Sequence, residues 1–324
     1  MILKGEDYFM SKFSKVAISL LAFIIIALAF AGDFFYGEAV QRGNEVELHS
    51  EEEIPVTINP DNEQIIEEAA QWYKEQEFEK VSIHTYDDLT LEGDFLKNED
   101  SEGKSVILAH GFRGNREDMG DFVRFYYDQG FDVLIPDARG HGGSEGDYIG
   151  FGWHERLDIR QWTGLLIDEE NSSDIFLHGI SMGAATVLMT SGEELPPEVK
   201  GIIADSPYTS GADILSYQLR SIYNLPAFPL IPITSGVTKL RAGFNFYEAS
   251  ALEQAEKNTH PLFIIHGEAD ELVPTSMGEE LYEAAGGDKM FWTVPDAGHV
   301  KAYTVATQEY QERLRGFIEK SMEK

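Results

Sequence analysis

Short apolar runs that recur at helical intervals constrain the fold of this chain more than any other feature. They read SVILAH (105–110), FDVLIPD (131–137), DIFLHGI (174–180), GIIAD (201–205), PLFIIHG (261–267) and MFWTVPD (290–296). Continuous apolar runs, rather than alternating ones, are typical of parallel strands covered by helices on both faces. The sequence therefore predicts an α/β fold with a mostly parallel central sheet. A chain of 324 residues, 43% of them hydrophobic, can bury such a sheet in one domain.

The flanking segments complete this predicted domain, which we place at residues 60–324. Residues 81–86 and 89–96 predict an antiparallel strand pair before the parallel strands. Between Asp205 and Leu262 the chain is longer than one crossover helix needs, and it includes the apolar stretch YNLPAFPLIPI. We expect an insertion at about residues 207–258 to form a lid over the strand ends.

The N-terminus carries the run VAISLLAFIIIALAFA at residues 16–31, with Lys12 and Lys15 before it and Asp33 after it. Such a run predicts a membrane-targeting helix within residues 1–36, followed by an acidic linker at 37–59. Lysines before the run and acids after it predict that the N-terminus lies in the cytoplasm and the main domain outside, and the bulky aromatic residues at 34–36 favour a single-pass anchor. Small residues up to Ala31 also fit a cleavable signal that would release a secreted protein. Met10 begins a more conventional lysine-bearing segment than Met1 does, which leaves the true start of the protein open between the two.

Charge and cysteine content exclude several classes of function. The chain has 25 Lys and Arg against 57 Asp and Glu, a formal net charge of −32. Such a surface repels phosphates, so nucleic acid is not an expected partner. The absence of cysteine excludes disulfides, thiolate nucleophiles and Cys-ligated metal sites.

The sharpest motif is Gly-Ile-Ser-Met-Gly at residues 179–183, between the apolar run 174–180 and a helix of small residues. Glycines allow a tight strand-to-helix turn that exposes the serine hydroxyl. Serine is a poor nucleophile unless a base takes its proton and a third group orients that base. The motif therefore predicts Ser181 as a nucleophile and requires a histidine and an acid later in the chain.

His299 fits the base, because it follows the last apolar run in the sequence Asp-Ala-Gly-His. Its strongest competitor is His141, whose position before the serine breaks the expected order of serine, acid, histidine. Asp270 follows the penultimate run and fits the acid, with Asp205 in reserve. We expect a triad of Ser181, His299 and Asp270.

The negative charge that develops on the substrate carbonyl oxygen needs hydrogen-bond donors. The segment His-Gly-Phe-Arg-Gly at residues 110–114 follows the first parallel run, and its glycines can turn an amide inward. We expect the backbone amides of Phe112 and Met182 to form this oxyanion hole.

Taken in order, the motifs HGFRG, DARGHGGSEGD, GISMGA, HGEADELVP and DAGH resemble the α/β-hydrolase family from residue 73 onward. Within that family they are similar to single-domain bacterial esterases related to serine aminopeptidases and to prolyl-oligopeptidase catalytic domains. The resemblance implies hydrolysis of an ester, thioester or amide through an acyl-enzyme, without metal or organic cofactor. The expected partner is a small-molecule or short peptide-like acyl substrate.

Three functions remain open on the sequence. The first is a carboxylesterase whose acyl pocket is shaped by the aromatic insertion. The second is an aminopeptidase-like amidase, which would need a carboxylate such as Asp213 or Glu248 to hold the substrate ammonium. The third is a catalytically silent, membrane-tethered binding module, which a complete triad disfavours.

Overall fold

The computed structural model describes residues 3–43 and 59–323, with side chains from residue 14 onward. Its centre is an eight-stranded sheet in the order β1-β2-β4-β3-β5-β6-β7-β8. The strands are β1 Glu79–His84, β2 Thr90–Leu96, β3 Lys104–Ala109, β4 Asp132–Pro136, β5 Asp174–Ile180, β6 Val199–Asp205, β7 Leu262–Gly267 and β8 Lys289–Val294. β2 pairs antiparallel with β1 and β4, and all other neighbours pair parallel. The prediction of a mostly parallel α/β sheet is confirmed.

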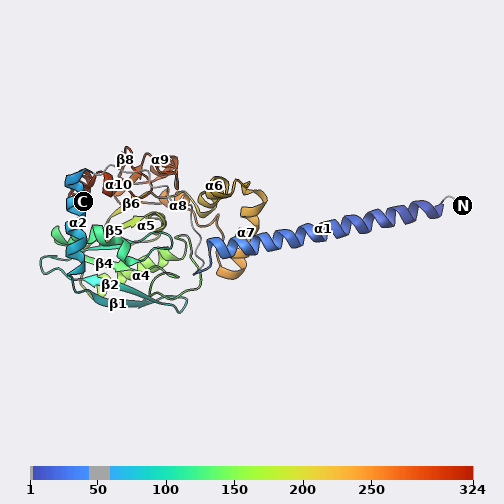
Figure 1. Ribbon diagram of the computed structural model, residues 1–324. Coiled ribbons are helices and arrows are strands. Elements are labelled where there is room, and N and C mark those ends of the chain that lie inside the picture. Colours follow the sequence, from blue (N-terminus) through green and yellow to red (C-terminus); the bar gives the residue numbers. More distant parts are fainter. Residues whose placement is uncertain (1–2, 44–58, 324) are drawn as a thin grey trace.

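Helices cover both faces of this sheet (Figure 1). One face carries α2 Pro60–Lys74, α3 Gly120–Asp128, α10 Ala302–Val305 and α11 Thr307–Met322, and the short 3-10 helix Arg116–Met119 precedes α3. The other carries α4 Glu155–Asp168, α5 Met182–Ser191, α8 Ala251–Ala255 and α9 Thr275–Ala284. In β3, Val106 and Leu108 face the first layer while Ile107 and Ala109 face the second. This double burial explains why the strands are continuous apolar runs.

The insertion after β6 contributes two helices at one end of the domain, α6 Gly211–Tyr223 and α7 Ala227–Ala242. Ser210 caps α6 by accepting a hydrogen bond from the amide of Asp213, and Asn224 ends it in the left-handed conformation. A bridge between Ser210 and Ser250 closes the base of the insertion.

The N-terminal helix α1, Leu3–Ala39, projects away from the domain, and its C-terminal end lies beside α7 (Figure 1). Most of its large apolar side chains from Val16 to Phe30 are exposed. In the part of the chain that the structure describes, Ser14–Ala39 is the one helix long and apolar enough to cross a membrane. A signal sequence has the same properties.

The chain continues from α1 onto the surface of the domain. Val40 is fully buried, and its carbonyl accepts a hydrogen bond from Ile149 at 2.8 Å. Gln41 forms a bridge with Tyr148, and the amide of Arg42 donates to the carbonyl of Asp147 at 3.0 Å. The linker expected at residues 37–59 therefore begins with residues that pack against the domain, while its residues 44–58 lie outside the described part.

Candidate active site

Ser181 occupies the sharp turn between β5 and α5. Its φ of 52° and ψ of −116° are rare for a residue with a side chain, and they cost on the order of 1–3 kcal/mol that the surrounding packing must offset. The amide of Ser181 donates to the carbonyl of Asp205 at 2.8 Å, which fixes the turn against the end of β6. The turn therefore presents the hydroxyl at the carboxyl edge of the parallel strands.

The two glycines of the motif allow this turn because backbone passes directly over backbone. A Cβ on Gly179 would lie 2.2 Å from the carbonyl carbon of Gly183. A Cβ on Gly183 would lie 2.0 Å from the carbonyl oxygen of Ala109 in β3. Both separations are well inside van der Waals contact, so any larger residue would push α5 off the sheet.

The structure brings Ser181, His299 and Asp270 together. His299 Nε2 lies 2.8 Å from Ser181 Oγ, and His299 Nδ1 lies 2.8 Å from Asp270 Oδ2. An ionised carboxylate only accepts hydrogen bonds, so Nδ1 carries the histidine proton and donates a hydrogen bond to Asp270. Nε2 is then free to accept from the serine hydroxyl, which is the arrangement that nucleophile activation requires.

Asp270 is buried, yet it is held in its charged form. Its Oδ1 accepts from the amides of Leu272 at 3.0 Å and Val273 at 2.8 Å. Burial by itself would raise the pKa of Asp270, but hydrogen bonds from His266 and His299 outweigh it and hold that pKa at about 2. The Nε2 atom of His266 lies 3.3 Å from Oδ2, a contact that was not predicted from the motifs.

Asp205, the reserve acid, lies at the end of β6 with different partners. Its Oδ1 accepts from the hydroxyl of Ser206 at 2.9 Å, and its Oδ2 from the hydroxyl of Tyr310 at 3.1 Å. Burial raises the pKa of Asp205 to about 6. The carboxylate of Asp205 is therefore engaged with Ser206 and Tyr310 in the interior. Asp270 is the acid that contacts His299.

His141 also has a role other than that of a base. Its Nδ1 donates to the carbonyl of Arg139 at 2.9 Å, so its Nε2 accepts from the amide of Arg113 at 3.1 Å. Burial, with a contribution from neighbouring His110, lowers the pKa of His141 to about 3 and keeps the ring neutral. His110 makes a matching bond, accepting from the amide of Ala138 at 3.0 Å. The two histidines thus brace the loop at residues 110–114, a role the sequence analysis missed although both lie in its motifs.

The amides expected to form the oxyanion hole belong to two segments that lie next to Ser181. Met182 is the first residue of α5, so its amide has no acceptor within the helix. Phe112 follows Gly111, where an added Cβ would lie 3.9 Å from Ser181 Oγ. The loop therefore passes within contact distance of the serine, and the ring of Phe112 lines the same cavity as Ser181.

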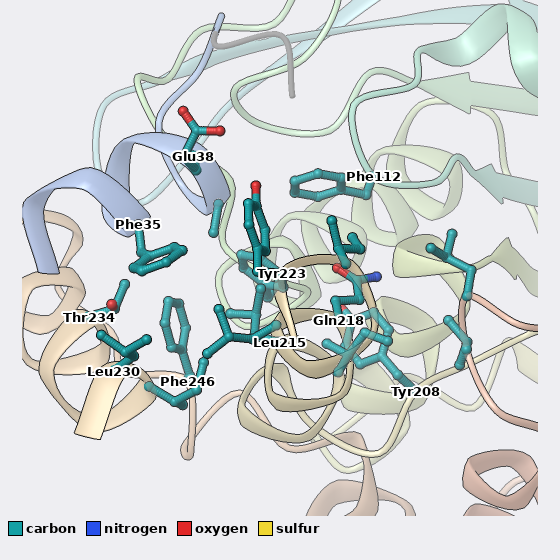
Figure 2. Close-up of a pocket in the computed structure, with 18 of the residues that line it drawn as sticks. Phe35, Glu38, Phe112, Tyr208, Leu215, Gln218, Tyr223, Leu230, Thr234 and Phe246 are labelled. Carbon is teal, nitrogen blue, oxygen red and sulfur yellow. The ribbon is translucent and has the colours of Figure 1, made fainter. Parts of the chain in front are cut away.

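That cavity has a volume of about 940 Å³, counted with the space at its open mouth. Its walls are mostly apolar and come from α6 (Ile214, Leu215, Leu219, Ile222, Tyr223), α7 (Leu230, Ile231), the core (Phe112, Phe151, Tyr208, Phe246, Leu272, Val273) and α1 (Phe35, Ala39). Figure 2 shows Phe35 and Phe112 on either side of Tyr223. Among the described residues that line it, Glu38 is the one charged side chain. The cavity can therefore hold an apolar acyl chain next to Ser181.

The carboxylates considered for an aminopeptidase have structural roles. Asp213 accepts from the hydroxyls of Thr209 at 2.9 Å and Ser210 at 2.6 Å. Glu248 forms an ion pair with Lys239 at 2.8 Å. Neither belongs to the described lining of the cavity.

The sheet order, the strand-to-helix turn at the serine and the covering insertion define an α/β hydrolase. The family model for serine aminopeptidase, S33, matches residues 100–227. The uncharacterized protein YqkD of Bacillus subtilis is 32% identical over 216 residues, which cover 66% of this chain and 71% of that protein. The chain belongs to this serine aminopeptidase S33 family of α/β hydrolases.

Other relatives are consistent with this family. Alpha/beta hydrolase domain-containing protein 17C of Homo sapiens is 26% identical over 265 residues, covering 78% of this chain and 70% of that protein. Among solved structures, the esterase Pf2001 of Pyrococcus furiosus is 28% identical with a TM-score of 0.62, covering 75% of this chain and 91% of that one. Acylaminoacyl peptidase of Pyrococcus horikoshii, at 16% identity and a TM-score of 0.56, shares the fold.

Proposed function

We propose that the protein is a membrane-anchored serine hydrolase that cleaves carboxylic esters through an acyl-enzyme. The observation that carries this proposal is the continuous hydrogen-bonded path from Ser181 through His299 to Asp270, with both distances at 2.8 Å. The esterase named among the similar solved structures supports the ester preference.

In the proposed mechanism each of these groups has one role. Ser181 Oγ attacks the ester carbonyl while its proton passes to His299 Nε2. Asp270 stabilises the imidazolium through Nδ1, and the amides of Phe112 and Met182 donate to the oxygen that becomes negative. His299 then protonates the departing alkoxide, leaving the acyl group on Ser181. Water deprotonated by His299 attacks this acyl-enzyme, releases the acid and restores the serine.

The cavity favours an ester of an apolar acid over an aminoacyl amide. An aminopeptidase must hold the ammonium of its substrate, and an unpaired charge in an apolar cavity is costly. Asp213 and Glu248 are engaged elsewhere. The amidase alternative therefore depends on Glu38 alone, whose carboxylate points away from the apolar side chains in Figure 2.

The test uses a fluorophosphonate, which reacts with activated serines, on the full chain and on Ser181→Ala. Intact-mass analysis should show one adduct on the wild-type protein and none on the variant. Hydrolysis of p-nitrophenyl butyrate should exceed that of aminoacyl p-nitroanilides in kcat/KM. A Ser181→Ala protein with full esterase activity would refute the proposal, and a wild-type protein that neither reacts nor hydrolyses would favour the silent binding module.

For location, we propose that residues 16–31 stay in the membrane and that the domain at residues 60–324 lies outside it. Membrane fractionation and intact-mass analysis of protein expressed with its own N-terminus test this. Retention of residues 16–31 in a membrane fraction is the expected result. A soluble exported species starting at Gly32 would instead show a cleaved signal, and a cytoplasmic full-length protein would contradict both.

A further inference from the structure

The end of helix α1 is attached to the insertion by close packing. Gly32 lies against α7 so tightly that a Cβ there would be 2.8 Å from the Cγ2 atom of Ile233. Beside it, Asp33 forms an ion pair with Arg241 at 2.6 Å. The guanidinium of Arg241 also lies 5.0 Å from the ring centre of Tyr36. We call residues 32–43 the docked segment.

The docked segment also forms one wall of the cavity that contains Ser181. Phe35, Glu38 and Ala39 line it. The ring of Phe35 packs edge-on against Tyr223 of α6, with ring centres 5.9 Å apart. Figure 2 shows Phe35 directed toward the side chains of the insertion. Without this segment, the cavity would lack its wall on the side of α1.

The same segment contacts the loop that carries the oxyanion amide. The guanidinium of Arg113, next to Phe112, donates to the carbonyl of Glu38 at 2.5 Å. Arg42 donates to the carbonyls of Gly142 at 2.8 Å and Ser144 at 2.6 Å. Those residues belong to the loop whose His141 accepts from the amide of Arg113. The docked segment is therefore hydrogen-bonded to the loop at residues 110–114 and to the loop that supports it.

Helix length places this wall at the level of the bilayer surface. Residues 16–31 rise about 24 Å at 1.5 Å per residue, and a bilayer core is about 30 Å thick. The hydrocarbon would therefore end within about one turn after Ala31, where the docked segment begins. The insertion beside it exposes large apolar side chains of its own, namely Tyr223, Leu225, Phe228, Leu240 and Tyr247. Exposed apolar groups next to a membrane helix fit contact with lipid.

We propose that the docked segment is a functional wall of the acyl cavity, and that the enzyme takes its substrate from the bilayer: a long-chain acyl ester of a membrane-resident amphiphile. This inference rests on the proposed esterase function. The cavity is apolar, it adjoins Ser181, and its wall on one side is the end of the membrane helix itself. An acyl chain that leaves the hydrocarbon at Phe35 can enter the cavity with little exposure to water, which removes the main cost of extracting such a chain.

The first experiment compares Phe35→Ala with Phe34→Ala in the full chain. Phe34 is the matched control, since it neighbours Phe35, is 55% exposed and is not among the described residues that line the cavity. The readout is the ratio of kcat/KM for p-nitrophenyl stearate to that for p-nitrophenyl butyrate in detergent micelles. Phe35→Ala should lower this ratio about tenfold, the effect of losing one buried aromatic contact. Phe34→Ala should leave it within about twofold, because the ring of Phe34 contacts Phe35, with ring centres 5.2 Å apart, but is not among the described residues that line the cavity.

An unchanged ratio in Phe35→Ala, or an equal fall in Phe34→Ala, would overturn the inference. Wild-type hydrolysis of the butyrate ester that depends on Ser181 tests the proposed function separately. An absence of Ser181-dependent ester hydrolysis is thus distinguishable from an unchanged chain-length preference in the Phe35 variant.

A second pair of variants tests the docking itself. Gly32→Val should separate α1 from α7 and lower the same ratio, because its side chain has no room beside Ile233 and Val237. Gly236→Val on α7 is the matched control, since an added Cβ there meets nothing within 4 Å. Equal ratios in the two variants would contradict a functional wall.

A third experiment tests the route of the substrate. The enzyme is reconstituted in phosphatidylcholine vesicles, and p-nitrophenyl stearate is placed either in the same vesicles or in separate ones. Hydrolysis should be at least about tenfold faster in the shared bilayer, because the long chain exchanges slowly through water. Equal initial rates would show that the ester arrives through water and would overturn the membrane route.

Discussion

His299 Nε2 lies 2.8 Å from Ser181 Oγ although the two residues are 118 positions apart in the chain. Parallel strands bring them together, because β5 and β8 end at the same edge of the sheet, where a sharp turn carries Ser181 and a loop carries His299. The same edge carries Asp270 after β7, so each member of the proposed triad follows a different strand.

Replacing Asp270 by Asn should lower kcat about 10⁴-fold. The amide of Asn can donate to Nδ1, which favours the histidine tautomer with its proton on Nε2 and leaves no acceptor for Ser181. Steady-state kinetics with a butyrate ester would measure the loss. Asp205→Asn is the matched control, and its loss should stay below about tenfold because that carboxylate does not contact His299. If Asp205→Asn were the more damaging change, the acid would be assigned wrongly.

His141 should act as a positioning residue for the oxyanion loop. His141→Ala removes the acceptor of the Arg113 amide, so the neighbouring Phe112 amide should lose its orientation and kcat should fall about 10²-fold with little change in KM. His141→Gln can still accept from that amide and should recover part of kcat. A rise in KM alone, or the same kcat in both variants, would indicate a role in packing instead.

Gly183→Ala should abolish activity and destabilise the protein by several kcal/mol, because its Cβ would lie 2.0 Å from the carbonyl oxygen of Ala109. Urea unfolding of the detergent-solubilised chain would measure this. Gly316→Ala in α11 is the control, since its Cβ meets nothing within 4 Å and should stabilise the helix by about 0.5–1 kcal/mol. Similar stability in the two variants would mean that the tight contact at Gly183 is not required.

Acid should destabilise the fold. Burial lowers the pKa of both His141 and His178 to about 3, so between pH 6.5 and 3 these rings take up protons in the unfolded chain but not in the folded one. Each then costs about 1.4 kcal/mol of stability for every pH unit lost within that window. Unfolding measured at pH 7 and pH 5 should show the fall, and equal stability at the two values would contradict it.

Asp205 should oppose this trend. Burial raises its pKa from 3.8 to about 6, so between these values it holds a proton in the folded state and gives it up on unfolding. Its contribution to stability therefore grows as pH falls from 6 to 4. In Asp205→Asn this offset is absent, and stability should fall more steeply with acid, by about 1.4 kcal/mol per pH unit. A slope equal to that of the wild type would show that Asp205 is ionised in the folded protein.

The sequence by itself determined the fold class and the place of the serine. Strands buried on both faces must be apolar throughout. The run DIFLHGI and the five similar runs could therefore be recognised as strands without knowing which strands pair with them. The glycines around Ser181 were equally visible, because tight backbone approach excludes every larger side chain. The long apolar run at residues 16–31 likewise predicted a helix that could insert into a membrane.

Tertiary structure alone decided which polar groups meet. Asp205 and Asp270 both follow parallel strands, and only the three-dimensional path of the loop at His299 brings it to Asp270. His141 was the strongest competitor of His299 for the role of the base, and the structure places its ring between the carbonyl of Arg139 and the amide of Arg113. Contacts between distant segments, such as Gly32 with Ile233, leave no periodic pattern in the sequence. They arise from surface complementarity between elements that are far apart in the sequence, and so the packing of the helix end against the cavity became visible only in the structure.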